Sequence, residues 1–284
     1  MVKLIDGKLV SEQLRLKLSQ ETAAFFKQMK VTPHLAVIIV GQDPASKTYV
    51  RNKQRACEIV GIKSTVIELD ELVSEVQLLR TINSLNADQA VHGILVQLPL
   101  PKHISEEHVI SAIDIKKDVD GFHPYQVGRL VAGLETLKPC TPAGVIELLK
   151  AYNIDLTGKH AVIVGRSQIV GKPLIQLLLD ENATVTVCHS HTQNLSQMTQ
   201  MADVLLVAVG RPEFITADMV KENAIVIDVG INRLETGKLV GDVAFDDVQK
   251  KASYITPVPG GVGPMTITML LKNTLEAAKL ATSL

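Results

Sequence analysis

The stretch KHAVIVGRSQIVGKPLIQLLL, residues 159–179, decides the fold of this chain. An apolar run at 161–164 ends at Gly165, and a loop of small residues leads to Pro173, where an apolar helical pattern begins. A continuous apolar run is typical of a buried parallel strand, and proline is favoured in the first turn of a helix. The order strand, glycine turn, helix gathers backbone N–H groups and a positive helix end, which suits a phosphate. The stretch predicts a nucleotide site in mid-chain.

The glycine loop differs from the usual GxGxxG fingerprint, and a tight structural turn is the alternative interpretation. The next expected strand indicates which nucleotide binds. In NAD sites that strand ends in an acid that holds the ribose 2′-hydroxyl, whereas here Cys188 is followed by His189, Ser190 and His191. A carboxylate would repel a 2′-phosphate, while Arg166, Ser190 and His191 can bind one. The sequence therefore predicts NADP rather than NAD.

A metal site at His189 and His191 is a weaker interpretation of the same segment. Alternate residues of a strand face opposite ways, and no third ligand stands nearby in the sequence. We therefore expect no metal.

Composition excludes several classes of protein. The 284 residues suggest about two domains, and 46% hydrophobic residues provide a sizeable core. A net charge of −1 and the absence of Trp argue against nucleic-acid binding. No apolar run is long enough to span a membrane, and the N-terminus lacks the apolar segment of a signal peptide. Three scattered cysteines fit a reducing compartment. We expect a soluble cytoplasmic protein without a nucleic-acid or membrane partner.

Strand-like runs alternate with helical patterns, which is typical of an α/β fold. Strands are expected at 34–40, 64–69, 92–96, 160–164, 183–188, 203–208 and 224–229. Helices are expected at 8–29, 44–60, 73–85, 142–151, 173–181 and 264–280.

The charged and Gly-containing segment 114–141 breaks this rhythm and is interpreted as a domain junction. We expect an N-terminal α/β domain at 1–138, completed by a C-terminal helix at 264–284. The second domain, 139–263, is expected to be Rossmann-like with a parallel sheet. Clefts between domains are favoured ligand sites, so a cleft between the two is expected.

Four polar side chains of the first domain are candidates for chemistry. Tyr49 and Lys53 are four residues apart, hence on one helix face. Gln97 follows a predicted strand, at the end where open α/β sheets bind ligands. Asp118 and Asp120 bracket one residue and can act as acid and base or as metal ligands. The alternatives are a solvated lysine, a cap at the sheet edge and an Asp-Gly turn.

The loop TPVPGGVGPMT, residues 256–266, holds three glycines and three prolines just before a helix. Such a loop lets backbone approach a ligand closely. A structural turn is the alternative, although it hardly needs so many special residues.

These motifs together resemble the bifunctional methylenetetrahydrofolate dehydrogenase/cyclohydrolase family (the FolD type). The resemblance rests on VGQDPASKTYV, HGILVQLPLP, KDVDGFHP, PCTPAGV, GRSQIVGKP, AIVIDVGINR and TPVPGGVGPMT. It covers nearly the whole chain, and QLPLP and PGGVGPMT are its most specific parts. The chain departs from the family pattern at Gln126, where Asn is usual, and at Ala244, where Asp is usual.

The resemblance implies oxidation of 5,10-methylenetetrahydrofolate with NADP, then hydration of the methenyl product to 10-formyltetrahydrofolate. These reactions belong to one-carbon metabolism, which supplies purine, histidine and methionine biosynthesis. Lys53 would be the catalytic lysine, held by Gln97, and Asp120 would anchor the pterin ring. The implied folate-binding residues are Tyr49, Gln97, Leu98, Asp120, Pro259, Gly260 and Gly261. The implied NADP-binding residues are Gly165, Arg166, Ser167, Ser190 and Ile231.

The family also implies a homodimer. Two alternatives remain beside the bifunctional enzyme. Some relatives use NAD and perform only the oxidation, but the acid expected after the strand 183–188 is missing. A binding module without catalysis would be expected to lose Lys53, Gln97 or Asp120, and all three are present.

Overall fold

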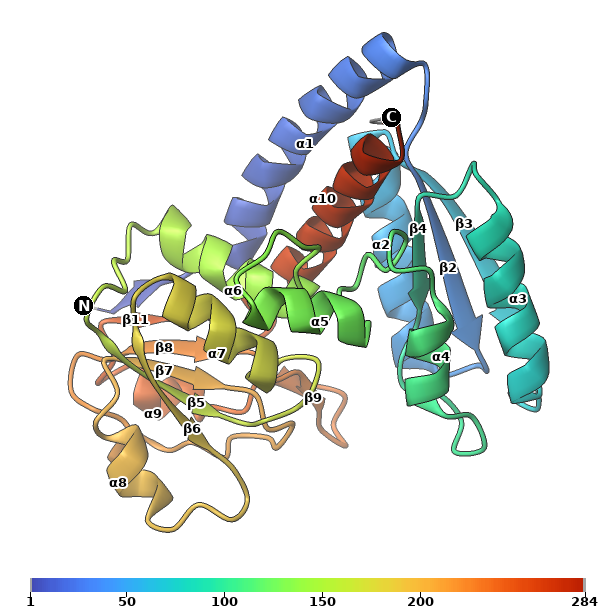
Figure 1. Cartoon of the computed structure of the whole chain (residues 1–284). Helices are drawn as coiled ribbons and strands as arrows, with labels where there is room; N and C mark the ends of the chain where they lie inside the picture. The colour runs from blue at the N-terminus through green and yellow to red at the C-terminus, as the bar shows by residue number, and fades with distance from the viewer. Residues whose placement is uncertain (1, 283–284) are drawn as a thin grey trace. The chain divides into compact units, whose positions relative to one another are not determined.

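The apolar runs of the sequence form two separate parallel sheets in the computed structural model, which describes residues 2–282 (Figure 1). The strands are β1 (Lys3–Leu4), β2 (His34–Val40), β3 (Lys63–Leu69), β4 (Gly93–Val96), β5 (His160–Val164), β6 (Thr184–Cys188), β7 (Val204–Val207), β8 (Ile225–Asp228), β9 (Asn232–Arg233), β10 (Leu239–Val240) and β11 (Tyr254–Ile255). Each of the seven predicted strands is present to within one residue at either end.

The six predicted helices are also present, to within two residues at either end. The helices are α1 (Gly7–Met29), α2 (Pro44–Val60), α3 (Glu75–Ala87), α4 (Glu106–Ala112), α5 (Pro124–Val131), α6 (Cys140–Ala151), α7 (Gly171–Asp180), α8 (Leu195–Thr199), α9 (Phe245–Val248) and α10 (Val262–Thr282), with a 3₁₀ turn at Ala217–Met219. Four short helices and four two-residue strands were not predicted.

The described residues group into two compact units. Of these residues, unit 1 comprises 2–12 and Thr141–Thr266, and unit 2 comprises Gln13–Cys140 and 267–282. Residues 2–12 group with unit 1, because β1 pairs with β11. The predicted junction 114–141 ends at the boundary between the units: residues 114–140 belong to unit 2, where Asp118 forms a backbone bridge with Ile94, and Thr141 begins the long segment of unit 1.

The sheet of unit 1 has the strand order β1-β11-β8-β7-β5-β6, with every pairing parallel. The chain runs from β5 to β6 on one side and then crosses to β7 on the other, so β5 and β7 flank a topological switch point. Ligands of open α/β sheets bind at the carboxyl ends of the strands there. Figure 1 shows α6 and α7 on one face of this sheet, with α8 and α9 on the other.

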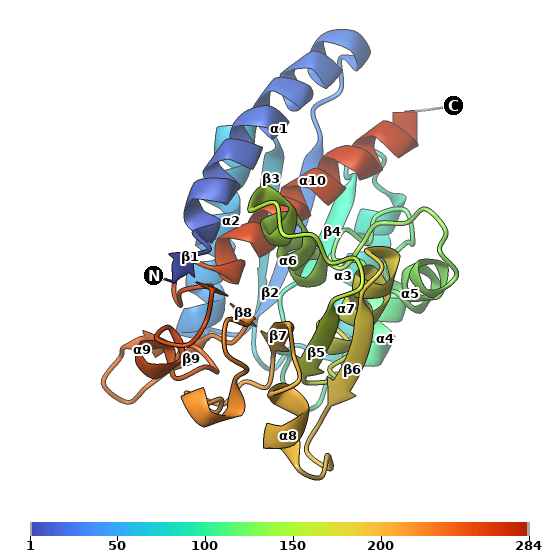
Figure 2. The ribbon, with the colours of Figure 1, turned by 90° about the vertical axis from the view of Figure 1, so that its left-hand side faces the viewer.

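The sheet of unit 2 has the order β3-β2-β4, and both pairings are parallel. Every residue of β2 is buried, which explains its unbroken apolar sequence. One face packs on α3 and α4 through Leu78, Ile82 and Val109. Figure 1 shows α2 on the opposite face. In Figure 2, α10 lies beside α1, where the Arg15 Nε donates to the Thr268 Oγ1 over 2.9 Å.

Within residues 2–282, no helix is both long and apolar enough to cross a membrane.

Candidate active site

Helix α2 carries the candidate lysine of unit 2. The Asp43 side chain caps this helix by accepting a bond from the Ser46 N–H over 2.7 Å, and Pro44 fills its first position. Tyr49 and Lys53 therefore lie one turn apart on a helix with a fixed start. Lys53 is only 6% exposed, so it is not the solvated lysine of the alternative interpretation.

Gln97 holds the ammonium group of this lysine. The Lys53 Nζ donates to the Gln97 Oε1 over 2.9 Å, although the two residues are 44 positions apart. Pairing of β2 with β4 brings them together, because the Gln97 N–H continues the ladder by donating to the Ile38 carbonyl oxygen over 2.8 Å. The Gln97 amide nitrogen donates to the Leu98 carbonyl oxygen over 2.7 Å, which turns its oxygen toward the lysine.

Burial moves Lys53 and Asp120 toward their uncharged forms. It lowers the pKa of the Lys53 ammonium group, against the opposing charge of Asp120. It also raises the pKa of the Asp120 carboxyl group to about 6, against the charge of Lys53 and with some help from Asp118. The Lys53 Nζ lies 5.7 Å from the centre of the Tyr49 ring. A lysine that loses its proton readily, beside a weak acid, is suited to general acid–base catalysis.

The structure separates the two aspartates that the sequence left as a pair. Asp118 is 1% exposed and accepts bonds from the Gly121 and His123 N–H groups over 3.1 and 2.8 Å. Asp118 thus forms the turn that ends at Gly121, where φ is 72°. Asp120 is half-buried and interacts with Lys53. Asp118 has a structural role, and Asp120 remains the candidate for chemistry.

The glycine loop of unit 1 fits a phosphate. A Cβ on Gly165, where φ is 126°, would lie 2.2 Å from the Ala208 carbonyl oxygen. A Cβ on Gly171 would lie 2.3 Å from the Gly165 carbonyl oxygen. The Ser167 Oγ accepts a bond from the Val170 N–H over 3.2 Å, which folds the loop onto the start of α7. Close backbone and a helix N-terminus at the switch point are what a dinucleotide pyrophosphate requires.

Residues predicted to select NADP follow neighbouring strands. The Gly165 N–H donates to the Cys188 carbonyl oxygen over 2.9 Å, so the loops after β5 and β6 leave the sheet side by side. Arg166 and Ser190 are both exposed in these loops. The His191 N–H donates to the His189 Nδ1 over 3.1 Å, within the same turn. Among residues 2–282, no group of three or more His, Cys, Asp or Glu side chains is arranged for a metal ion.

The loop at 256–266 is a tight backbone junction. The Lys8 N–H donates to the Gly260 carbonyl oxygen over 3.0 Å, and a Cβ on Gly7 would lie 1.8 Å from the Gly261 carbonyl oxygen. Gly260 has a φ of 106°, and a Cβ on Gly261 would lie 2.6 Å from the Pro257 carbonyl oxygen, so both positions favour glycine. Gly260 and Gly261 also remain predicted folate contacts. Pro259 is exposed at the same loop and remains a predicted folate contact.

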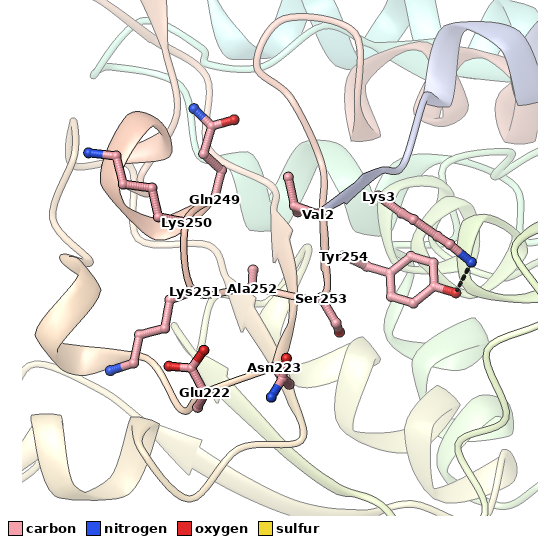
Figure 3. Close-up of a pocket in the computed structure, with 10 residues that line it drawn as sticks. All are labelled: Val2, Lys3, Glu222, Asn223, Gln249, Lys250, Lys251, Ala252, Ser253 and Tyr254. Carbon is pink, nitrogen blue, oxygen red and sulfur yellow. Dashed lines mark hydrogen bonds between the residues drawn. The ribbon is translucent and has the colours of Figure 1, made fainter.

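A surface pocket at the amino-terminal ends of β1, β8 and β11 is lined by Val2, Lys3, Glu222, Asn223, Gln249, Lys250, Lys251, Ala252, Ser253 and Tyr254 (Figure 3). Its lysines already have partners: Lys250 pairs with Asp247 over 2.7 Å, and the Lys251 Nζ donates to the Ala217 carbonyl oxygen over 3.1 Å. The pocket also lies at the opposite edge of the sheet from the glycine loop. It is not the candidate site.

The two departures from the family pattern have local explanations. The Gln126 amide donates to the Ile115 carbonyl oxygen over 2.6 Å and accepts a bond from the Thr136 hydroxyl, so the longer side chain is fully used. Ala244 precedes α9 without a side-chain cap, a position where aspartate is favoured. None of the hydrogen bonds of Gln126 involves Lys53 or the glycine loop.

Sequence reasoning missed two groups. Cys140, buried in unit 2, shares electrostatic interactions with Lys53 and Asp120. Asp228 and Asp242 form a buried carboxyl pair in unit 1, and burial with the charge of Asp242 raises the pKa of Asp228 to about 7. The signal for the pair was visible in DVGIN and GDV, where an acid stands beside glycine next to an apolar strand.

A parallel sheet with a phosphate-binding loop at its switch point, and a buried lysine held by an amide in the second unit, define a nucleotide-dependent enzyme with acid–base chemistry. Family models agree. The catalytic-domain model of tetrahydrofolate dehydrogenase/cyclohydrolase matches residues 5–120, and its NAD(P)-binding-domain model matches 139–282. The chain belongs to the tetrahydrofolate dehydrogenase/cyclohydrolase family, as the sequence predicted.

Individual relatives resemble nearly the entire chain. The bifunctional protein FolD of Bacillus anthracis is 59% identical over 278 residues, 98% of this chain and 97% of that protein. The crystal structure of the bifunctional FolD enzyme from Campylobacter jejuni is 55% identical, with a TM-score of 0.96 and 99% of each chain covered. The Trypanosoma brucei FolD structure, a complex with NADP cofactor and inhibitor, is 39% identical with a TM-score of 0.96, covering 100% of this chain and 99% of that one.

Proposed function

We propose that this chain performs the two FolD reactions with Lys53, Gln97, Tyr49 and Asp120 as its folate-site chemistry. The enzyme oxidises 5,10-methylenetetrahydrofolate with NADP and hydrolyses the methenyl product to 10-formyltetrahydrofolate. The observation that carries the proposed residue roles is the buried Lys53, whose Nζ lies 2.9 Å from the Gln97 Oε1. The neutral Gln97 side chain fixes the position of the Lys53 Nζ. Because Gln97 carries no negative charge, it does not form an ion pair that would hold Lys53 in its ammonium form.

For the oxidation, the chain supplies binding and orientation. NADP accepts a hydride when bound, and this chemistry belongs to the cofactor. Gly165 and Ser167 would hold the pyrophosphate at the start of α7, Arg166 and Ser190 would bind the 2′-phosphate, and Ile231 would contact the cofactor through its exposed side chain. Tyr49 and Leu98 would line the folate. Positioning supplies much of the rate of such a transfer.

For the hydrolysis, Lys53 acts as the general base. The methenyl substrate is a cation, and an ammonium group beside it would be repelled; burial already favours the neutral amine. The amine takes a proton from water as the water oxygen bonds to the methenyl carbon. Breaking of one carbon–nitrogen bond of the ring then leaves the 10-formyl group, and the departing nitrogen takes up a proton. Gln97 keeps the amine in place throughout.

Removal of the Asp120 charge should weaken folate binding. We expect Asp120→Asn to raise the Kd of a folate-analogue inhibitor by about 10- to 100-fold, because charge-assisted hydrogen bonds to the pterin are lost. With a pKa of about 6, Asp120 is ionised above that pH, so wild-type affinity should fall as the pH drops below about 6. Titration of the inhibitor at several pH values between about 5 and 8 measures both the loss of affinity in the variant and the pH dependence in the wild type.

The variant itself is the control for this pH effect, because Asp120→Asn should bind with the same weak affinity across the range. Asp120 also acts to raise the pKa of Lys53. The pH profile of hydrolysis should therefore move to lower pH in the variant. Unchanged affinity together with an unchanged profile would contradict the role of Asp120.

Removal of the Arg166 charge should reduce the preference for NADP. We expect Arg166→Ala to raise the Kd for NADP by about 10- to 100-fold and to leave the Kd for NAD within about 2-fold, because only NADP carries the 2′-phosphate. Lys250→Ala is the charge-matched control, since Lys250 is exposed and pairs with Asp247 at the opposite edge of the sheet. Calorimetric titration with each nucleotide provides the measurement. An equal loss for both would place Arg166 elsewhere on the cofactor.

Three broader proposals accompany the reaction. We propose that residues 1–138, completed by the C-terminal helix 264–284, form the folate-binding domain, and that 139–263 form the NADP-binding domain. We propose a homodimer, consistent with exposed apolar side chains such as Leu16 and Phe26 of α1, which light scattering tests directly. We place the enzyme in the cytoplasm, since its three cysteines are free and buried.

A further inference from the structure

A buried pair of carboxyl groups closes the carboxyl end of the unit 1 sheet. Asp228 is the last residue of β8, and Asp242 follows β10. Their side chains are 3% and 0% exposed. Burying a carboxylate is costly unless hydrogen bonds replace its water, so the partners of this pair indicate what the pair is for.

Asp242 binds two segments of the chain. Its Oδ2 accepts from the Val209 and Gly210 N–H groups over 2.7 and 2.9 Å. Its Oδ1 accepts from the Arg211 N–H over 2.9 Å and from the Asn232 side-chain amide over 2.8 Å. Three successive N–H groups around one anion form a backbone nest. This nest fixes the loop that leaves β7.

Asp228 binds the backbone of Asp242 and of its neighbours in the fold. Its Oδ1 accepts from the Gly230 and Asp242 N–H groups over 2.9 and 3.0 Å, and its Oδ2 accepts from the Val243 N–H over 2.9 Å. Asp228 therefore holds the backbone of Asp242 in place, while Asp242 holds the loop after β7. The two carboxyl groups act in series.

Glycines leave space for these carboxyl groups. A Cβ on Gly230 would lie 2.2 Å from the Asp242 Cγ, and a Cβ on Gly241 would lie 1.8 Å from the Asp228 Oδ2. The motifs DVGIN and GDV thus encode one packed assembly, in which each aspartate is matched by a glycine of the other motif.

Ile231 lies between two anchored neighbours. Gly230 is bonded to Asp228 and Asn232 to Asp242, yet the Ile231 side chain between them is 45% exposed. An exposed branched aliphatic side chain on a backbone fixed at both sides is a preorganised apolar contact. The loop 209–211 follows β7, one of the two strands at the switch point.

We propose that Asp228 and Asp242 are positioning residues for NADP, acting through Ile231 and the loop 209–211. This inference rests on the proposed function, because it takes Ile231 as a cofactor contact. Neither carboxyl group need touch the cofactor. Their role is to hold the apolar contact and the loop after β7 in the binding geometry before NADP arrives.

The test compares NADP affinity with a reaction that needs no NADP. Asp242→Asn turns one oxygen into a donor that faces N–H groups, and Asn232→Ala removes a single bond at a half-exposed position. We expect calorimetry to give an NADP Kd raised about 10-fold or more in the first variant and about 3- to 10-fold in the second. Hydrolysis of methenyltetrahydrofolate should stay within about 2-fold of wild type, because it occurs without NADP. Asn232→Ala keeps the test decisive if Asp242→Asn does not fold.

A double-mutant cycle identifies the route of the effect. Asn232→Ala and Ile231→Ala should be non-additive in NADP affinity, because both act on the same contact. An NADP Kd within about 2-fold of wild type in Asn232→Ala would overturn the proposal, and so would an equal loss of hydrolysis and NADP affinity. An unchanged NADP Kd in Ile231→Ala would also overturn this inference. It would not contradict the proposed NADP-dependent oxidation. Absence of NADP binding by the wild-type enzyme would instead contradict the proposed function.

Discussion

Replacement of Lys53 by methionine is expected to lower the rate of methenyltetrahydrofolate hydrolysis by about 10²- to 10⁴-fold, the usual contribution of a general base. Methionine has a similar length and suits the buried position, where Lys53 is only 6% exposed, so the fold should persist. The reaction is measured by the loss of methenyl absorbance without nucleotide. Thermal unfolding of the variant verifies that the protein remains folded.

Lys47→Met is the matched control for this variant. Lys47 lies on the same helix α2, but its side chain is 34% exposed and pairs with Glu68 over 3.6 Å. The control should hydrolyse the substrate at close to the wild-type rate. Lys53→Arg should be nearly as slow as Lys53→Met, because a guanidinium group cannot give up its proton in a protein. A hydrolysis rate in Lys53→Met within about 2-fold of wild type would rule out the proposed base.

Replacement of Gly165 by alanine is expected to lower the free energy of unfolding by about 3 kcal/mol or more and to abolish measurable NADP binding. The added Cβ would lie 2.2 Å from the Ala208 carbonyl oxygen, and backbone at a switch point between two central strands has little room to move. The φ of 126° adds strain for any residue with a Cβ. Denaturant unfolding and calorimetric titration measure the two effects.

The control Gly158→Ala separates the strain of a positive φ from the steric clash of an added Cβ. Gly158 also has a positive φ, 72°, but a Cβ there would meet no atom within 4 Å. That variant should lose only about 1 kcal/mol of stability and bind NADP normally. If Gly165→Ala behaved like Gly158→Ala, the close approach of the two strand ends would not be what fixes the glycine loop.

The regular elements followed from the sequence because buried parallel strands and long amphipathic helices have strong periodic patterns. β1 and β11 did not, since each has two residues and depends on its neighbours. Their pairing through Lys3 and Tyr254 draws the N-terminus into unit 1. A pairing partner 251 positions away produces no recognisable pattern in the local sequence.

The folate-side residues were predicted partly from position and partly from resemblance. Gln97 stands at the end of an apolar strand, which physical reasoning identifies as a ligand position. Its bond to Lys53 could not be deduced from spacing, since it depends on the pairing of β2 with β4. Likewise, only the fold distinguishes the turn-forming Asp118 from Asp120.

Burial decides which polar groups matter, and sequence does not display burial. Lys53 on α2 looks like an ordinary surface lysine in the sequence, yet its pKa is lowered because it is buried. Asp228 and Asp242 look like turn residues, yet together they accept seven hydrogen bonds. In both cases the role of the residue is visible only from its surroundings in the folded protein.

The central claim is that one enzyme oxidises the methylene substrate with NADP and then hydrolyses the product. The most direct test is a progress curve of the purified protein with 5,10-methylenetetrahydrofolate and either NADP or NAD, following methenyl absorbance. The account predicts that with NADP the absorbance rises and then decays as 10-formyltetrahydrofolate forms, and that NAD gives a much slower rise. A rise with NADP that decays no faster than in enzyme-free buffer, or no rise at all, would contradict it.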